Sequence, residues 1–174
     1  MEFEKKLEEM LSYIKFNRGA SKSFSFRGPG NPAYWALGTG RNYMDRNLQQ
    51  LFDDGFVFSE EKELMMERTI EELLLNSCID GCRESDDLNV MLNSYFGDKG
   101  IVFHIKDDGN GFDYKSKLAQ RKRELHLYDR NTVLSDSRES KRSGHGMYCL
   151  LTFPDDFSYN KQGNEVAVRF DLGK

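Results

Sequence analysis

The most informative residues of the sequence are Ile101-Val-Phe-His-Ile-Lys-Asp107-Asp-Gly-Asn-Gly111. The β-branched and aromatic residues at the start of this run predict a strand, and the Asp-Asp-Gly-Asn-Gly run predicts a tight turn directly after it. An EF-hand calcium loop is excluded, because its first and last ligand positions would fall on Lys106 and Lys117. The turn is therefore either a plain connection or a ligand site, in which the Asp107 carboxylate accepts a hydrogen bond from a ligand's amino group.

A hairpin and a long helix are predicted upstream of this turn. Residues 89–96 form a second β-rich run, and Gly97-Asp-Lys-Gly100 joins it to the strand that begins at residue 101. The helix is expected to begin at Ser59, an N-cap residue followed by Glu60 and Glu61 in the first turn, and to end at Gly81. Its buried stripe is expected to consist of Met66, Ile70, Leu73, Leu74 and Ser77.

Glu72 and Asn76 lie one turn apart on this helix, on an edge beside the apolar stripe. They are either part of an ordinary solvated face, or a general base and an oxygen ligand for a hard cation such as Mg²⁺. The pair alone does not decide between these two interpretations.

Three further elements are predicted nearer the N-terminus. Apolar residues at helical spacing predict a helix over residues 2–16, and the alternation in Lys22-Ser-Phe-Ser-Phe-Arg27 predicts the first strand. Gly28-Pro-Gly30 breaks that strand, and Asn31-Pro32 opens a helix that ends at Asp53-Asp-Gly55.

A charged segment follows the Asp107 turn, with nine basic and five acidic residues between Asp113 and Arg142. It is either a solvated loop or a cover over an anionic ligand. The segment leads into Ser143-Gly-His-Gly146, which opens a helix, and backbone N–H groups at a helix N-terminus attract anions. His145, between two glycines, is interpreted as a loop residue rather than a catalytic base or phosphoacceptor.

The chain closes with two strands, over residues 157–161 and 165–172, which are joined by a Gln-Gly-Asn turn. The order of elements predicts an α+β fold, a two-layer sandwich rather than a doubly wound fold. Its sheet is expected to have about five strands, to be mixed but mainly antiparallel, and to carry the helices on one face.

Composition excludes several classes of protein. The chain has 174 residues, which suits one domain, and a net charge of −4, which argues against nucleic-acid binding. No apolar run approaches the roughly 20 residues of a membrane span, and the N-terminus does not have the pattern of a secretory signal, so a cytoplasmic protein without membrane contact is expected. Cys78 and Cys82 are interpreted as spectator thiols rather than metal ligands.

Taken in order, these motifs resemble the GHKL superfamily of histidine kinase-like ATP-binding domains, which share the Bergerat fold. The sequence of motifs is Glu-x-x-x-Asn, a hairpin, Asp-x-Gly-x-Gly, a charged lid, Gly-x-Gly and two closing strands. The resemblance runs from Ser21 to Leu172 and implies an N-terminal helical extension over residues 1–20 and an ATP-binding domain over residues 21–174. Within the superfamily the chain looks most like the anti-sigma factor serine kinases. They share a compact length, a Phe-Ser-like opening before the nucleotide-site helix, here Gly55-Phe-Val-Phe-Ser59, and a closing pattern of strand, Gly-Asn and strand, here over residues 157–166.

The resemblance implies a role for each matching residue. Glu72 matches the catalytic base, Asn76 the magnesium ligand and Asp107 the carboxylate that reads the adenine amino group. Gly109 and Gly111 match the glycines beside that carboxylate, and Gly144 and Gly146 match the second glycine box, which holds phosphate. The predicted nucleotide-binding set also includes Lys141, Arg142 and His145. Asp80 stands where many members have histidine, and Met147 replaces the usual leucine.

ATP and Mg²⁺ are the cofactors that the resemblance implies, and a serine/threonine protein kinase acting as an anti-sigma-type regulator is the function. The expected partner is a protein, either a sigma factor or an anti-sigma antagonist, and the chain is a candidate homodimer. Two alternatives stay open: an ATP-dependent protein-binding switch without catalysis, and the ATP-binding domain of a sensor histidine kinase.

Overall fold

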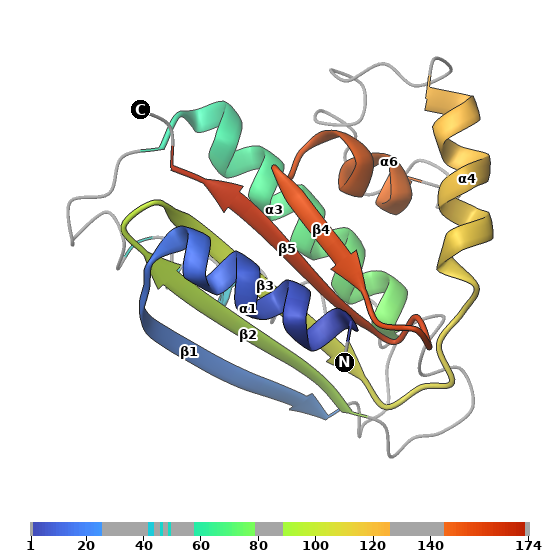
Figure 1. Cartoon of the computed structure of the whole chain (residues 1–174), viewed down its shortest axis with the longest axis horizontal. Coiled ribbons are helices and arrows are strands. Elements are labelled where there is room, and N and C mark those ends of the chain that lie inside the picture. The colour runs from blue at the N-terminus through green and yellow to red at the C-terminus, as the bar shows by residue number, and fades with distance from the viewer. Residues whose placement is uncertain are drawn as a thin grey trace.

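A computed structural model describes residues 2–25, 42, 43, 46, 49, 58–78, 89–125 and 145–172. Within them five strands form one sheet in the order β1-β2-β3-β5-β4, and every described strand pair is antiparallel (Figure 1). The strands are β1 (Phe16–Ser25), β2 (Asn89–Gly97), β3 (Gly100–Asp107), β4 (Asp156–Tyr159) and β5 (Glu165–Asp171). The α+β class, the central hairpin and the two closing strands are confirmed.

Helices cover both faces of this sheet (Figure 1). The helices α3 (Glu60–Asn76) and α6 (His145–Thr152) pack over the face that carries Phe103 and Val168. On the opposite face, α1 (Glu2–Ile14) covers Val102 and Ala167 (Figure 1). Successive side chains of a strand alternate between faces, so the sheet has a second apolar patch that needs a cover. α1 is therefore the exception to the expected placement of the helices on one face.

The predicted start of α3 is confirmed in detail. The Ser59 hydroxyl oxygen accepts a hydrogen bond from the backbone N–H of Lys62 at 3.2 Å, and acidic residues occupy the first turn. Their negative charges interact favourably with the positive end of the helix dipole, which stabilises the start of the helix. The buried stripe comprises Met65, Met66, Thr69, Ile70, Leu73 and Leu74, and Ser77 after it is also buried. Burying this stripe against the sheet and α6 fixes the side of α3 on which Glu72 and Asn76 lie.

β1 begins six residues before its predicted start at Lys22. Residues 17–20 have low intrinsic strand preference, and the register shows what orders them, since Phe16 pairs with Gly97 and Gly19 with Tyr95 of β2. The boundary proposed between residues 20 and 21 falls inside this strand. Long-range pairing, rather than local pattern, thus determines where β1 begins.

Several predicted features lie wholly or partly outside the described residues. These are the Gly28-Pro-Gly30 break, most of the helix predicted for residues 31–53, Asp80, Cys82 and the end of the charged segment. α3 itself ends at Asn76, with Ser77 as its C-cap, five residues before the predicted end at Gly81. Of the 31–53 segment, Asn42, Tyr43, Arg46 and Gln49 are described, and they are helical. No described helix has the length and apolar character needed to cross a bilayer.

Met10→Ala tests whether α1 is an integral part of the fold. Met10 is fully buried between α1 and the sheet, so its truncation should lower the free energy of unfolding by about 2–5 kcal/mol. Urea unfolding followed by circular dichroism would measure this loss. Glu8→Ala, on the exposed side of the same helix, is the matched control, and equal stability of the two variants would show that α1 contributes no packing energy.

Candidate functional site

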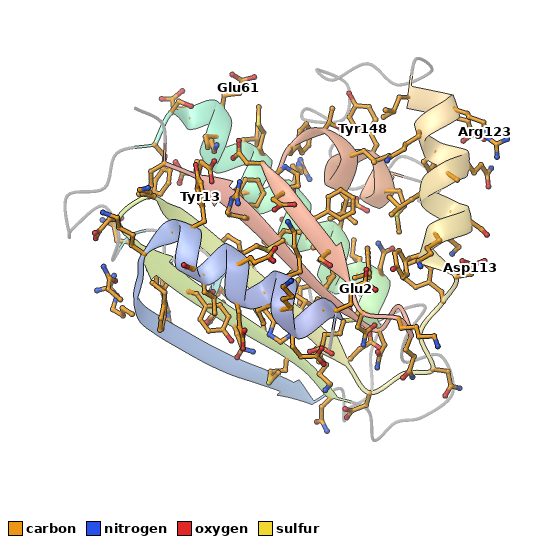
Figure 2. All side chains as sticks on the ribbon, in the orientation of Figure 1. Glu2, Tyr13, Glu61, Asp113, Arg123 and Tyr148 are labelled. Atoms are coloured by element: carbon orange, nitrogen blue, oxygen red, sulfur yellow. The ribbon has the colours of Figure 1, made fainter. Side chains whose placement is uncertain are left out.

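A cavity of about 300 Å³ lies where β3 ends at Asp107. Residues at the ends of β3, β4 and β5 line it, together with the C-terminal half of α3, the turn after β3, the start of α6, the turn between β4 and β5, and α4 (Tyr114–Glu124). In Figure 2, Asp113 marks the start of α4 and Tyr148 lies on α6. Glu72, Asn76, Asp107, Gly111 and Gly146 all line this one cavity. Residues that are distant in the sequence are thus brought together.

Asp107 is a buried carboxylate with only 6% of its surface exposed. Its Oδ1 accepts a hydrogen bond from the backbone N–H of Gly109 at 2.9 Å, and the Ser77 side chain also hydrogen-bonds to it. Burial raises the pKa of the Asp107 carboxyl above its ordinary value, and these two hydrogen bonds oppose the rise. A carboxylate offers about four acceptor positions, so a donor on a ligand can still be accommodated.

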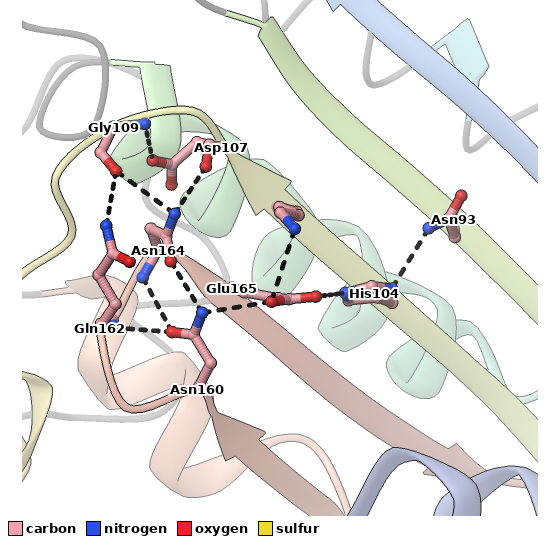
Figure 3. Close-up of polar contacts among 10 residues, drawn as sticks. Asn93, His104, Asp107, Gly109, Asn160, Gln162, Asn164 and Glu165 are labelled. Carbon is pink, nitrogen blue, oxygen red and sulfur yellow. Dashed lines mark hydrogen bonds and ion pairs between the residues drawn. The ribbon is translucent and has the colours of Figure 1, made fainter. Parts of the chain in front are cut away.

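The backbone of Asp107 is held on both sides by Asn164, from the turn between β4 and β5 (Figure 3). The Asp107 N–H donates to the Asn164 carbonyl at 3.0 Å, and Asn164 Nδ2 donates to the Asp107 carbonyl at 2.9 Å. The same amide nitrogen reaches the Gly109 carbonyl at 3.3 Å. These bonds fix the direction in which the Asp107 side chain leaves the end of β3.

Two glycines allow the turn after β3 to pack against the turn between β4 and β5. Gly111 has φ +72°, and a Cβ there would lie 2.1 Å from the Gln162 carbonyl oxygen. Gly163 has φ +82°, and a Cβ there would lie 2.2 Å from the Phe112 carbonyl oxygen. Each position needs both the left-handed backbone and the missing side chain. The Asp-x-Gly-x-Gly motif therefore shapes the cavity through packing of these two turns.

Glu72, Asn76 and Gly146 meet where α6 packs on α3. A Cβ on Gly146 would lie 2.6 Å from Asn76 Nδ2 and 3.3 Å from Glu72 Oε2. Only a glycine lets the first turn of α6 approach both side chains this closely. Of the remaining predicted phosphate residues, His145 begins α6, whereas Lys141, Arg142 and Gly144 lie outside the described residues.

α4 contributes residues that the sequence analysis missed. It lies within the segment treated as a charged lid, and Lys117, Gln120 and Arg121 on it line the cavity. Its apolar pattern is too weak to predict a helix, and no residue of α4 is buried. The helical signals are the N-cap residue Asp113, which accepts a hydrogen bond from the Ser116 N–H at 3.2 Å, and strong helix formers after it.

The described residues of the site offer few side chains that could bind a metal ion. Among the described residues, no three His, Cys, Asp or Glu side chains are grouped to hold a metal ion. Asn76 therefore suits an ion such as Mg²⁺ only if ligand oxygens and water supply most of the coordination. Cys78 and Cys149 are buried free thiols, and burial raises the pKa of Cys149, which is consistent with core residues.

The family model described as the histidine kinase-like ATPase domain matches residues 44–170. The chain belongs to this family. The match includes every cavity residue named above and begins after α1 and β1. Comparison with curated proteins gives no match. Membership supports an ATP-binding domain, while the closer similarity to anti-sigma factor kinases stays a prediction.

Asp107→Asn should separate nucleotide affinity from stability. Asparagine keeps the size of the side chain and an acceptor for the Gly109 N–H but removes the charge. Because the folded-state pKa is raised, the ionised carboxylate destabilises the fold at neutral pH, and this cost disappears as pH falls through that pKa. The variant should therefore unfold at a higher temperature than the unliganded wild type at pH 7, with no such gain in acid.

The same Asp107→Asn variant should bind ATP about tenfold more weakly or worse, since it loses a charged acceptor in a buried site. Thermal unfolding at pH 7 and in acid, with and without ATP, measures both effects. Unchanged ATP affinity would show that Asp107 does not contact the nucleotide.

Gly146→Ala should displace Asn76 and weaken ATP binding about tenfold, because its Cβ overlaps the Asn76 amide. Gly19→Ala is the matched control, since a Cβ at Gly19 meets only ordinary contacts of 3.4 Å or more. Isothermal titration of both variants with ATP provides the measurement. Wild-type affinity in Gly146→Ala would mean that this contact does not shape the binding site.

Proposed function

We propose that the protein is an ATP-dependent serine/threonine protein kinase that acts as an anti-sigma-type regulator. One observation carries this proposal: Glu72, Asn76, Asp107 and Gly146 line a single cavity in a histidine kinase-like ATPase domain. Two parts of this proposal are inferred from the resemblance alone. They are the phosphate acceptor, a Ser or Thr hydroxyl, and the partner, a sigma factor or an anti-sigma antagonist. The homodimer is part of the same proposal.

Asp107 forms the adenine end of the proposed site. Its carboxylate accepts a hydrogen bond from the amino group of adenine, whereas guanine presents a carbonyl oxygen at the corresponding position. Two acceptors facing each other in a buried site are unfavourable. The protein should therefore prefer ATP to GTP.

The triphosphate end of the proposed site is formed by α3, α4 and α6. Asn76 would provide an amide oxygen for Mg²⁺, and the ion would neutralise part of the charge on the phosphates. Lys117 and Arg121 add positive charge to the cavity wall. The backbone N–H groups at the start of α6 favour phosphate, and Gly144, Lys141 and Arg142 extend this anion site in the proposal.

Glu72 is the proposed catalytic residue. Its carboxylate lies beside Gly146, at the end of the cavity where α6 begins. There it can orient and deprotonate an incoming Ser or Thr hydroxyl. Phosphoryl transfer asks a protein mainly for positioning and charge stabilisation, which the arrangement of these groups supplies.

A nucleotide-gated binding switch is the second candidate. The observation in its favour is that α4 buries none of its own residues and yet lines the cavity. A bound nucleotide would order such a helix and so control a protein contact, without phosphoryl transfer. A sensor histidine kinase domain is the third candidate and would transfer phosphate to histidine instead.

Glu72→Gln distinguishes the kinase from the switch. In a kinase, the variant should bind ATP within about twofold of wild type, while phosphoryl transfer falls by about 10²-fold or more. Glu71→Gln is the matched control, because Glu71 is the adjacent acid, pairs with Arg68 at 3.1 Å and does not line the cavity.

The measurement combines calorimetry with a transfer assay. Titrations with ATP, ADP and GTP, with and without Mg²⁺, test nucleotide preference, and γ-labelled ATP with candidate partners tests transfer. Label on Ser or Thr that disappears in Glu72→Gln supports the kinase. ATP binding without transfer to any candidate partner contradicts the kinase and favours the switch.

A further inference from the structure

A chain of hydrogen bonds leads from the cavity to the opposite face of the sheet (Figure 3). Asn160 Nδ2 donates to Asn164 Oδ1 at 2.8 Å, and Asn164 in turn holds the backbone of Asp107. The same Asn160 nitrogen donates to Glu165 Oε2 at 3.2 Å. The other Glu165 oxygen lies 2.8 Å from His104 Nε2. The end of β3 is thus connected to a histidine that the nucleotide does not contact in the proposed site.

His104 is buried, with 6% of its surface exposed. Its Nδ1 lies 3.2 Å from Asn93 Nδ2, an amide donor, so the ring carries its proton on Nε2 and donates it to Glu165. Burial lowers the pKa of His104 despite the neighbouring Glu165, and Lys106 acts in the same direction as burial. The neutral ring is therefore a fixed donor that orients the Glu165 carboxylate.

The carboxylate in turn orients the turn between β4 and β5. Glu165 fixes the amide nitrogen of Asn160, whose Oδ1 accepts hydrogen bonds from the N–H groups of Gly163 at 2.7 Å and Asn164 at 3.2 Å. The Asn160 side chain thereby fixes the backbone conformation of the turn that holds Asp107. Without the His104 donor, one oxygen of Glu165 loses its partner inside the protein.

α1 covers the His104 end of this chain of hydrogen bonds. The Phe3 ring lies with its centroid 5.7 Å from that of His104, and Phe3 is buried. α1 is also attached by the Lys6–Asp156 ion pair at 2.8 Å and by the Tyr13 hydroxyl, which donates to Asp171 at 3.2 Å. A helix of 13 residues is marginal alone in water, so its order depends on this docking.

We propose that His104 is a positioning residue for the nucleotide site, acting through Glu165, and that docking of α1 over it is coupled to nucleotide affinity. The inference rests on the proposed ATP binding and deepens it, by assigning regulation of that site to the N-terminal helix. Docked α1 keeps His104 buried and limits the access of water to its bond with the partly exposed Glu165, and so preserves the orientation of the Asp107 turn. Because coupling is reciprocal, bound ATP must stabilise the docked α1 by the same factor.

The first test compares His104→Leu with His104→Gln in the full chain, by titration with ATP and Mg²⁺. Leucine removes the donor to Glu165 and should weaken ATP binding roughly tenfold. Glutamine retains an N–H donor and should remain within about threefold of wild type. Ile101→Ala is the control. Ile101 is buried at the opposite end of β3 from Asp107, so this variant should lose stability without losing affinity for ATP.

The second test measures amide hydrogen exchange of α1 with and without ATP and Mg²⁺. ATP should slow exchange in α1 of the wild type but not of His104→Leu. Phe3→Ala, which uncovers His104 and lies outside the cavity, should weaken ATP binding about threefold and remains informative if His104→Leu does not fold.

Two results would overturn the inference in different ways. If the wild type binds ATP and either His104→Leu or Phe3→Ala binds it equally well, the coupling is wrong while the proposed function stands. If the wild type binds no nucleotide, the proposed function fails and the coupling fails with it.

Discussion

The paired hydrogen bonds between Asp107 and Asn164 are the constraint on which the rest of the site depends. They join the end of β3 to the turn before β5, two segments more than fifty residues apart. The glycines at 111 and 163 permit the close approach that these bonds need. With this junction in place, the buried carboxylate points into the cavity that α3 and α6 complete. The end of the cavity at Asp107, where adenine is proposed to bind, is therefore determined mainly by contacts between turns.

The same junction explains why the proposed role of Asp107 and the stability of the fold oppose each other. A carboxylate is most useful as an acceptor where water is excluded, and there its charge is most costly. The Gly109 and Ser77 hydrogen bonds offset part of that cost without removing it, since burial still raises the pKa of Asp107. The packed faces of the sheet supply the surplus stability, through α3 and α6 on one face and α1 on the other.

Which features could be predicted from the sequence depends on whether the interactions that determine them are local or join distant parts of the chain. The positions of Glu72 and Asn76 on one edge of α3 were predictable because helical spacing and an N-cap are local signals, and that of Asp107 because it ends a strongly patterned strand. That the three residues share one site was predicted only from the resemblance. Local pattern could not identify Asn164 or His104 as part of the support of the site, because their roles arise from pairing across the sheet. α4 was missed for a different reason: it has no fully buried residue and packs on the core only through partly buried side chains such as Tyr114 and Leu118. Its hydrophobic period is therefore weak, and only capping and propensity signals were present.

The N-terminal helix is best understood from what it covers. The family match begins at residue 44, so α1 and β1 lie outside the matched domain. Yet α1 buries Val102 and Ala167 and closes the surface over His104, all three of which lie inside the match. Without α1, water would reach the apolar patch and would compete for the carboxylate that the histidine orients. A segment interpreted as an extension from the sequence therefore packs on the sheet face opposite the proposed nucleotide site, and through His104 and Glu165 its docking can control that site.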